Sequence, residues 1–155
     1  MHQVFLFDKV AVVVGPWWEP ADPPERGARV ELRFRAPEPH RGSESAAQRV
    51  VIDQPLFRAD LFDQCDEPPG NLRAAHFHEG FDGVEPRDRQ WPPELKDDPA
   101  RWLVAQLSDL RGVLIRSGIE VDDTAWIDAD AAGLRDACPA IVAAVEQTWR
   151  TVRAC

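Results

Sequence analysis

The chain has 155 residues, of which 44% are hydrophobic and 29% are charged, and its formal net charge is −9. This composition is typical of globular proteins and excludes collagen and coiled coils. The longest aliphatic run, Val10–Val14, is far shorter than the ~20 residues that a membrane span needs. An acidic chain repels phosphate backbones, so overall charge disfavours nucleic-acid binding. We expect one domain over residues 1–155.

Residues 1–78 are predicted to be mainly β-structure. The strands are expected at Val4–Val14, at Arg29–Arg35, on both sides of Pro55 (49–54 and 57–62), and at Leu72–His78. Proline has no backbone N–H group to donate a hydrogen bond between strands, so Pro55 marks either a bulge in one strand or the boundary of two short strands. The connections are short enough for hairpins, which favours an antiparallel meander.

The clearest strand signal is the alternation in residues 29–35. Val30, Leu32 and Phe34 share one predicted face with Phe57, Ala59 and Leu61, and this face is expected to be buried. The opposite face carries Arg29, Arg33, Arg35 and Arg58. Guanidinium groups suit phosphate, so Arg33, Arg35 and Arg58 are candidate substrate-binding residues. The alternative is a solvated face on which Glu31 and Asp60 neutralise the arginines.

Two connections could contact partners. Trp17 and Trp18 are predicted to lie in the first loop, where they either form an exposed patch or cover the end of the core. Residues 79–98 are predicted to be an acidic loop. Such a loop can act as a lid, face a basic partner protein or hold a cation, and the alternative is a solvated crossing from sheet to helix.

Residues 99–155 are predicted to be mainly helical. Asp98 followed by Pro99 is typical of a helix start, and Gly118 of a helix end. A second helix is expected to start at Cys138–Pro139, after a short helical turn within residues 128–137. The predicted fold is therefore α+β: an antiparallel sheet of four to five strands in a meander, with two main C-terminal helices packed on one face.

His76 and His78 are the candidate catalytic residues. At positions i and i+2 of a strand both side chains point to one face, which is the helix side if Arg73 points outward with the other arginines. In that case the histidines and arginines form one site only at a strand end or across a bulge. We expect a carboxylate close by, from Asp60, Glu79, Asp82 or Glu85. Such a set can perform general acid–base chemistry. It is also compatible with a divalent metal but does not require one. The alternative is a pair of structural histidines at a strand end.

Several short motifs resemble the TumE-type toxins of toxin–antitoxin systems, over about residues 28–117. These are Val30-Glu31 at the start of a strand that leads into Arg35-Ala36-Pro37-Glu38-Pro39, then Gly42-Ser43, His76-Phe77-His78, and Glu85-Pro86 before the helix near Pro99. Phe77 stands where the family typically has a basic residue. The resemblance implies a small cytoplasmic α+β protein that acts on RNA or nucleotides and is neutralised by an antitoxin protein, with His76, His78 and Glu85 as catalytic residues.

Two functions therefore stay open. The first is a TumE-like toxin or relative. The second is a non-catalytic interaction module that presents the Trp17/Trp18 loop and the acidic loops to a basic partner protein. Three cysteines and the absence of a secretory leader at the N-terminus favour a reducing, cytoplasmic location.

Overall fold

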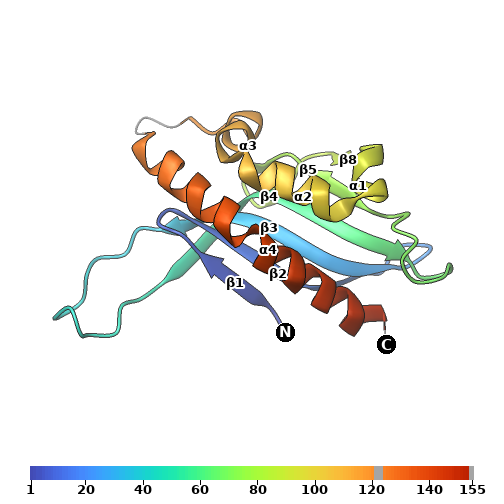
Figure 1. The fold of residues 1–155 in the computed structure, drawn as a ribbon, viewed down its shortest axis with the longest axis horizontal. Helices are drawn as coiled ribbons and strands as arrows, with labels where there is room; N and C mark the ends of the chain where they lie inside the picture. Colours follow the sequence, from blue (N-terminus) through green and yellow to red (C-terminus); the bar gives the residue numbers. More distant parts are fainter. Residues whose placement is uncertain (121–123, 154–155) are drawn as a thin grey trace.

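A computed structural model describes residues 1–120 and 124–153. It shows an α+β fold in which an antiparallel sheet carries the helices on one face (Figure 1). The strands are β1 (Gln3–Leu6), β2 (Val10–Glu19), β3 (Glu25–Ala36), β4 (Val51–Gln64), β5 (His76–His78), β6 (Phe81–Asp82), β7 (Glu85–Pro86) and β8 (Arg89–Gln90). The helices are α1 (Pro93–Asp97), α2 (Pro99–Ser108), α3 (Leu110–Arg116) and α4 (Ala125–Arg153). No helix within the described ranges is both long enough and apolar enough to cross a membrane.

The main sheet follows the predicted meander but has more strands. Its order is β1-β2-β3-β4-β5-β8, six strands among the described residues, and β6 pairs separately with β7. The predicted number of four to five was too low because β1 and β8 are short and carry little periodic signal. Val4–Val14 is in fact two strands, β1 and β2, joined by a turn at residues 7–9.

The predicted faces of the central strands are confirmed. Val30 and Leu32 of β3 and Phe57, Ala59 and Leu61 of β4 are at most 1% exposed and pack in the core. Phe34 is only partly buried, because it pairs with Val10 where β2 begins.

Pro55 lies within one continuous strand, β4, so the bulged alternative is the correct one. It is opposite Arg33, with register shifts on both sides of that pair. Beyond these shifts β3 and β4 run on into the connection 37–50, which projects away from the body of the molecule (Figure 1).

The prediction of a loop at Trp17 and Trp18 is wrong, because both residues belong to β2. β1 pairs with β2 only as far as Val14, so from Pro16 onward β2 is an edge strand. An edge strand tolerates a proline, since on its free side no neighbouring strand requires a hydrogen bond from the missing N–H group.

The prediction of a structureless loop at residues 79–98 is also wrong. The segment forms the β6–β7 hairpin, the edge strand β8 and helix α1. Gly83 at the hairpin turn has φ of 66°, a conformation that side chains with a Cβ atom rarely adopt. Strands of two residues have no detectable alternation, so the sequence pattern did not reveal them.

The first helical region starts and ends as predicted. The Asp98 side chain accepts a hydrogen bond of 2.9 Å from the backbone N–H of Arg101, as expected of an N-cap. The region is divided at Asp109, which ends α2 and caps α3 through the N–H of Gly112. Gly118 follows α3 with φ of 74°.

The prediction that a helix starts at Cys138–Pro139 is wrong. A single helix, α4, runs from Ala125 to Arg153 and includes residues 128–137. Pro139 lies on its exposed side, where the carbonyl group of Arg135 that loses its helical partner can be hydrated. The buried stripe continues on both sides of the proline, with Leu134 and Ile141 fully buried. Packing therefore outweighs the helix-breaking tendency of Pro139.

Both ends of α4 are fastened to the sheet. Near its start, the buried Asp130 carboxylate accepts hydrogen bonds from the backbone N–H groups of Asp8, Lys9 and Val10. Near its end, the Arg153 guanidinium binds the carboxylate of Asp63 at 2.8 Å. The helix thus covers one face of the sheet along its length (Figure 1).

Candidate active site

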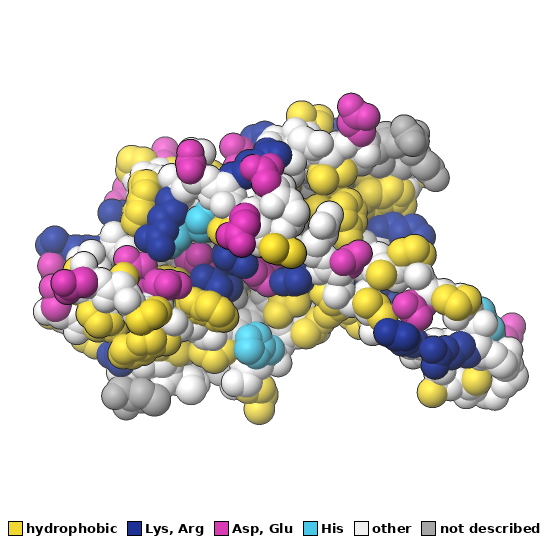
Figure 2. Space-filling model, turned by 180° about the vertical axis from the view of Figure 1, so that it is seen from behind, with side chains coloured by type: hydrophobic (Ala, Val, Ile, Leu, Met, Phe, Trp, Pro, Cys, Tyr) yellow, Lys and Arg dark blue, Asp and Glu magenta, His cyan; other side chains and the backbone are white. Residues whose placement is uncertain are grey.

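The sheet face opposite the helices is polar; we call it the polar sheet face. Alternation along β3, β4 and β5 places on it Arg29, Glu31, Arg33, Arg58, Asp60, His76 and His78. Seen from behind in Figure 2, this region shows basic and acidic side chains side by side, with histidine among them. The helices leave this face free, so polar groups that pair with one another can lie there.

Asp60 and the two histidines form a buried cluster on this face. β5 is antiparallel to β4, with His76 opposite Asp60 and His78 opposite Arg58. The Nε2 atoms of His76 and His78 lie 3.4 and 3.6 Å from the same oxygen, Oδ2 of Asp60. All three residues are at most 6% exposed. The predicted proximity of a carboxylate to the histidine pair is therefore confirmed, with Asp60 as that carboxylate.

Backbone carbonyl groups orient both rings. Nδ1 of His76 lies 2.7 Å from the carbonyl oxygen of Ala74, and Nδ1 of His78 lies 2.5 Å from that of Arg87. A carbonyl oxygen only accepts hydrogen bonds, so each Nδ1 carries a proton and donates it. Each Nε2 is consequently the atom left for chemistry, and both point to Asp60.

The histidines lie on the arginine side of the sheet, not on the helix side that an outward Arg73 in the same strand would imply. Phe77, between them, faces the helices and packs against Trp102 of α2, with ring centroids 5.0 Å apart. The alternation of faces cannot be counted from Arg73 to His76, because residues 72–75 form a turn rather than a strand. Leu72 has φ of 48°, and its carbonyl accepts the N–H of Ala75. The two candidate groups, histidines and arginines, therefore share one surface.

Asp60 is held as a carboxylate. Burial raises the pKa of its carboxyl group, but N–H donation from His76 and His78, when their Nε2 atoms carry a proton, and from Arg29 more than reverses this effect, and the pKa lies well below its ordinary value. Nε of Arg29 donates to Oδ1 of Asp60 at 2.6 Å. Nη2 of Arg29 also donates to Oδ2 at 3.3 Å, and this same Oδ2 faces the histidines.

A hollow of about 250 Å³ lies on the same sheet face and is connected to the cluster by Arg29, which lines the hollow and binds Asp60. Arg29, Arg33 and Arg58 line it, together with Glu31 and Trp17. Glu31 neutralises two of the arginines, accepting from Nη1 of Arg33 at 2.5 Å and from Nε of Arg58 at 2.8 Å. The arginines are therefore paired and partly buried rather than freely solvated.

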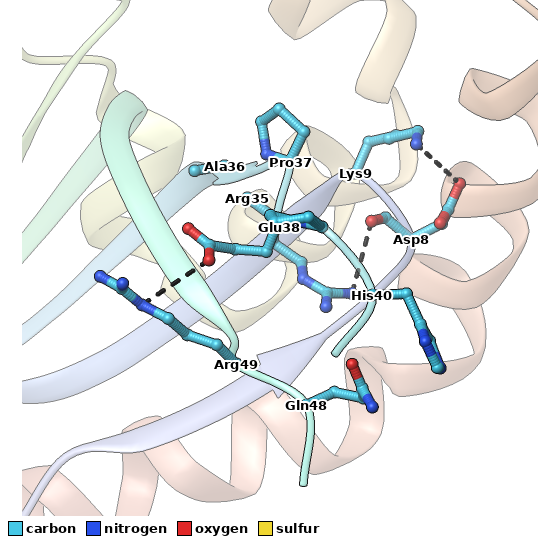
Figure 3. A pocket seen from close by; sticks show the side chains of 10 residues that line it. Asp8, Lys9, Arg35, Ala36, Pro37, Glu38, His40, Gln48 and Arg49 are labelled. Atoms are coloured by element: carbon cyan, nitrogen blue, oxygen red, sulfur yellow. Dashed lines mark hydrogen bonds and ion pairs between the residues drawn. The ribbon is translucent and has the colours of Figure 1, made fainter. Parts of the chain in front are cut away.

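Arg35, the third arginine predicted to bind substrate, lies elsewhere. Its guanidinium donates to the carbonyl oxygens of Phe7 and Asp8 and lines a second hollow at the base of the 37–50 connection (Figure 3). In that view Glu38 and Arg49 form an ion pair across the connection. Of the predicted set, Arg58 lies opposite His78 in the neighbouring strand, whereas Arg33 lines the hollow together with Arg58.

The acidic residues after His78 are spread over the surface. Glu79 pairs with Arg116 at 2.8 Å, and Asp82 pairs with Arg87 at 3.1 Å. Glu85 is exposed on β7, opposite Asp82 in the hairpin. In the described part of the chain, Asp60 rather than Glu85 is the carboxylate that approaches both rings.

Aromatic side chains frame the cluster. Trp91 packs over His76 with ring centroids 4.9 Å apart, and Phe62 meets the same imidazole edge-on. The Arg29 guanidinium lies 3.8 Å from the centroid of a Trp17 ring. Arg29 belongs to the arginine face that the alternation predicts, although it was not among the three arginines expected to bind substrate. The sequence pattern did not assign Trp91 to the site, because Trp91 carries no such signal.

The cluster has the donor set of a metal site. One ligand atom from each of Asp60, His76 and His78 lies within 4.8 Å of the other two, and among the described residues this is the group of three that meets that criterion. No protein-family model, curated protein or solved structure matches the chain. The function is therefore argued from this geometry.

Proposed function

We propose that the protein is a TumE-like toxin, or a relative of those toxins, and that it acts on RNA or nucleotides through Asp60, His76 and His78. One observation carries the proposal: an ionised carboxylate and two oriented imidazoles lie on the same sheet face as a hollow lined by three guanidinium groups. Reactive groups beside phosphate anchors are what a phosphate-ester substrate requires.

The local charge supports an anionic substrate although the chain as a whole is acidic. Arg29, Arg33 and Arg58 face the two carboxylates of Asp60 and Glu31. Three guanidinium groups against two carboxylates leave one positive charge over among these five side chains. A local field of this kind attracts a phosphate even when the net charge of the protein is negative.

The register of the strands brings the two groups together. Arg58 is the cross-strand neighbour of His78, so a phosphate bound by the Arg58 guanidinium lies beside the histidine pair. Arg33 approaches the same carboxylate, Glu31, and can share the phosphate. In this proposal Asp60 takes the carboxylate role that the resemblance implied for Glu85, and Arg35 has no part.

The test measures toxicity and RNA chemistry with matched variants. Expression of the wild-type protein should arrest growth of a bacterial host, and the purified protein should cleave or modify total RNA or nucleoside triphosphates. The double variant H76N/H78N should do neither. His40→Asn, which changes an exposed histidine on the projecting connection, should behave as wild type.

Thermal melting of each variant shows whether it folds. The proposal is overturned if the wild type leaves growth, RNA and nucleotides unchanged, or if a folded double variant is as active as the wild type. A cytoplasmic location and an antitoxin partner belong to the same proposal. The free thiols of Cys65 and Cys138 suit a reducing compartment.

An interaction module is the second candidate, because Trp17 and Trp18 are 42% and 56% exposed. With Pro16, Arg26 and the end of α4 they line a largely apolar hollow of about 290 Å³. A basic partner such as an antitoxin would then bind Trp18 and the acidic segment 79–98. In a pull-down with the protein encoded next to this one, Trp18→Ala should lose the partner and H76N/H78N should keep it. Loss of the partner with H76N/H78N alone would contradict this candidate.

A further inference from the structure

We infer that Asp60 Oδ2, His76 Nε2 and His78 Nε2 bind one divalent ion of the first transition row, such as Zn²⁺. The inference goes beyond the proposed function, because it concerns the ion and holds whatever the substrate is. Its starting point is an unpartnered atom: Nε2 of His76 is buried and has no hydrogen-bond partner. Buried polar atoms nearly always have partners, so this one needs an explanation.

A proton shared between histidine and aspartate does not explain the geometry. A hydrogen bond from a charged imidazole to a carboxylate is about 2.7–2.9 Å long. The two Nε2–Oδ2 distances are 3.4 and 3.6 Å. Both rings stand back from Asp60, although it is the carboxylate they face.

A tetrahedral metal ion explains the same distances. Zinc binds histidine nitrogen and carboxylate oxygen at about 2.0–2.2 Å, so two ligands of one tetrahedral ion lie roughly 3.4 Å apart. The observed separations of 3.4 and 3.6 Å match that edge. The gap between Asp60 and the two imidazoles therefore has the size of an ion.

The surroundings are those of metal ligands. Metal-binding histidines typically donate the other ring N–H to a carbonyl or carboxylate, which fixes the tautomer and the ring direction. Here the carbonyl groups of Ala74 and Arg87 accept both Nδ1 protons. Arg29 fixes the Asp60 carboxylate through both oxygens, at 2.6 Å to Oδ1 and 3.3 Å to Oδ2, and a carboxylate oxygen has a second lone pair, so Oδ2 can still act as the ligand atom.

The donor types select the class of ion. Two imidazole nitrogens and one carboxylate oxygen suit Zn²⁺, Fe²⁺, Co²⁺ or Ni²⁺, whereas Mg²⁺ and Ca²⁺ prefer sites built from oxygen alone. Three protein ligands also leave a coordination position free, which is typical of catalytic rather than structural zinc. Arg29 links the cluster to the neighbouring hollow, because it contacts Asp60 and lines that hollow.

The test is a metal titration of the full chain after removal of metals with a chelator. Zn²⁺, measured in competition with a chromophoric chelator, should bind with one equivalent per chain. Co²⁺ should give visible absorption bands whose intensity indicates four- or five-coordination. Mg²⁺ in the same concentration range should not compete. His76→Ala and His78→Ala should each weaken Zn²⁺ binding by roughly 100-fold or more, since even outer-shell changes cost about 10–100-fold.

His40→Ala, which changes an exposed histidine on the projecting connection, is the matched control and should bind Zn²⁺ as the wild type does. Zn²⁺ should raise the melting temperature of the wild type and of this control but not of His76→Ala or His78→Ala, and far-UV circular dichroism shows that each variant is folded. Wild-type protein that takes up no stoichiometric Zn²⁺, folded histidine variants with unchanged affinity, or equal affinity for Mg²⁺ would each overturn the inference. No RNA or nucleotide enters this titration. A protein that binds Zn²⁺ but leaves RNA intact therefore contradicts only the proposed function, and an active protein that binds no Zn²⁺ contradicts only this inference.

Discussion

Replacing Asp130 with alanine should destabilise the protein strongly, because this buried side chain joins α4 to the turn between β1 and β2. Its carboxylate accepts hydrogen bonds of 2.9, 2.8 and 3.2 Å from the N–H groups of Asp8, Lys9 and Val10. The Val10 N–H is buried and loses its partner outright, whereas those of Asp8 and Lys9 lie at an exposed turn and can bind water. A hydrogen bond to a charged group contributes about 1.5–3 kcal/mol, so we expect a total loss of roughly 3–5 kcal/mol.

Urea denaturation followed by tryptophan fluorescence measures this loss as a lower midpoint at unchanged slope. For a domain of this size the melting temperature should fall by roughly 6–20 °C, at about 2–4 °C per kcal/mol. Asp130→Asn keeps one acceptor oxygen and should lie between alanine and wild type. The matched control is Asp128→Ala on the same helix, whose side chain is 83% exposed and which should change stability by no more than about 0.5 kcal/mol. If Asp130→Ala shifts the midpoint no more than this control does, hydration satisfies the three N–H groups and the argument is refuted.

Three further substitutions test the sheet. Phe57→Ala should cost about 3–5 kcal/mol in urea denaturation, because Phe57 is 1% exposed and its removal leaves a cavity; a loss below about 1 kcal/mol would contradict its core position. Gly27→Ala should also destabilise, since the added Cβ atom would lie 2.2 Å from the carbonyl oxygen of Leu61 in the paired strand; an unchanged melting temperature would show that the strands can separate there without cost. Asp63→Asn should reduce stability in a way that depends on pH. Burial raises the pKa of Asp63, but hydrogen bonds from Arg153 and from two backbone N–H groups lower this pKa by more, so that it lies below its ordinary value. The stabilisation is therefore complete above the unfolded-state pKa of about 4 and is lost as the pH falls below it. The difference between wild type and Asp63→Asn should be largest near neutral pH and shrink in acid, and a difference that grows in acid would have the wrong sign.

Local patterns predicted much of the fold. The alternation around Leu32 identified the buried face of β3, and Asp98 followed by proline identified the start of α2. Both signals act within a few residues and do not depend on the rest of the chain. Pro139 misled because its local cost is outweighed by the long buried stripe of α4, which packs on strands far away in the sequence. Trp18 was misplaced for a related reason, since the extent of β2 depends on its pairing with β3.

The candidate site was predictable in its parts but not in its assembly. The spacing of His76 and His78 gave their common face, and Asp60 was among the carboxylates expected nearby. The face that they share depends on the turn at Leu72. Leucine rarely adopts a positive φ, so the sequence did not indicate this turn. Which carboxylate they meet depends on the register of β4 against β5. Register is set by the whole sheet, so sequence spacing alone left Glu85 as plausible a partner as Asp60.

The two fastenings of α4 have a consequence for the order of folding. Asp130 and its partners are 120–122 residues apart in the chain, whereas the strands that carry Asp60, His76 and His78 are close in sequence. Closing a long loop costs more entropy, so contacts within the meander should form before α4 docks. The loss of Asp130 should then speed unfolding and leave the folding rate almost unchanged. Until α4 arrives, the apolar face of the sheet is open to solvent, and a chain that stalls at this stage is prone to aggregate.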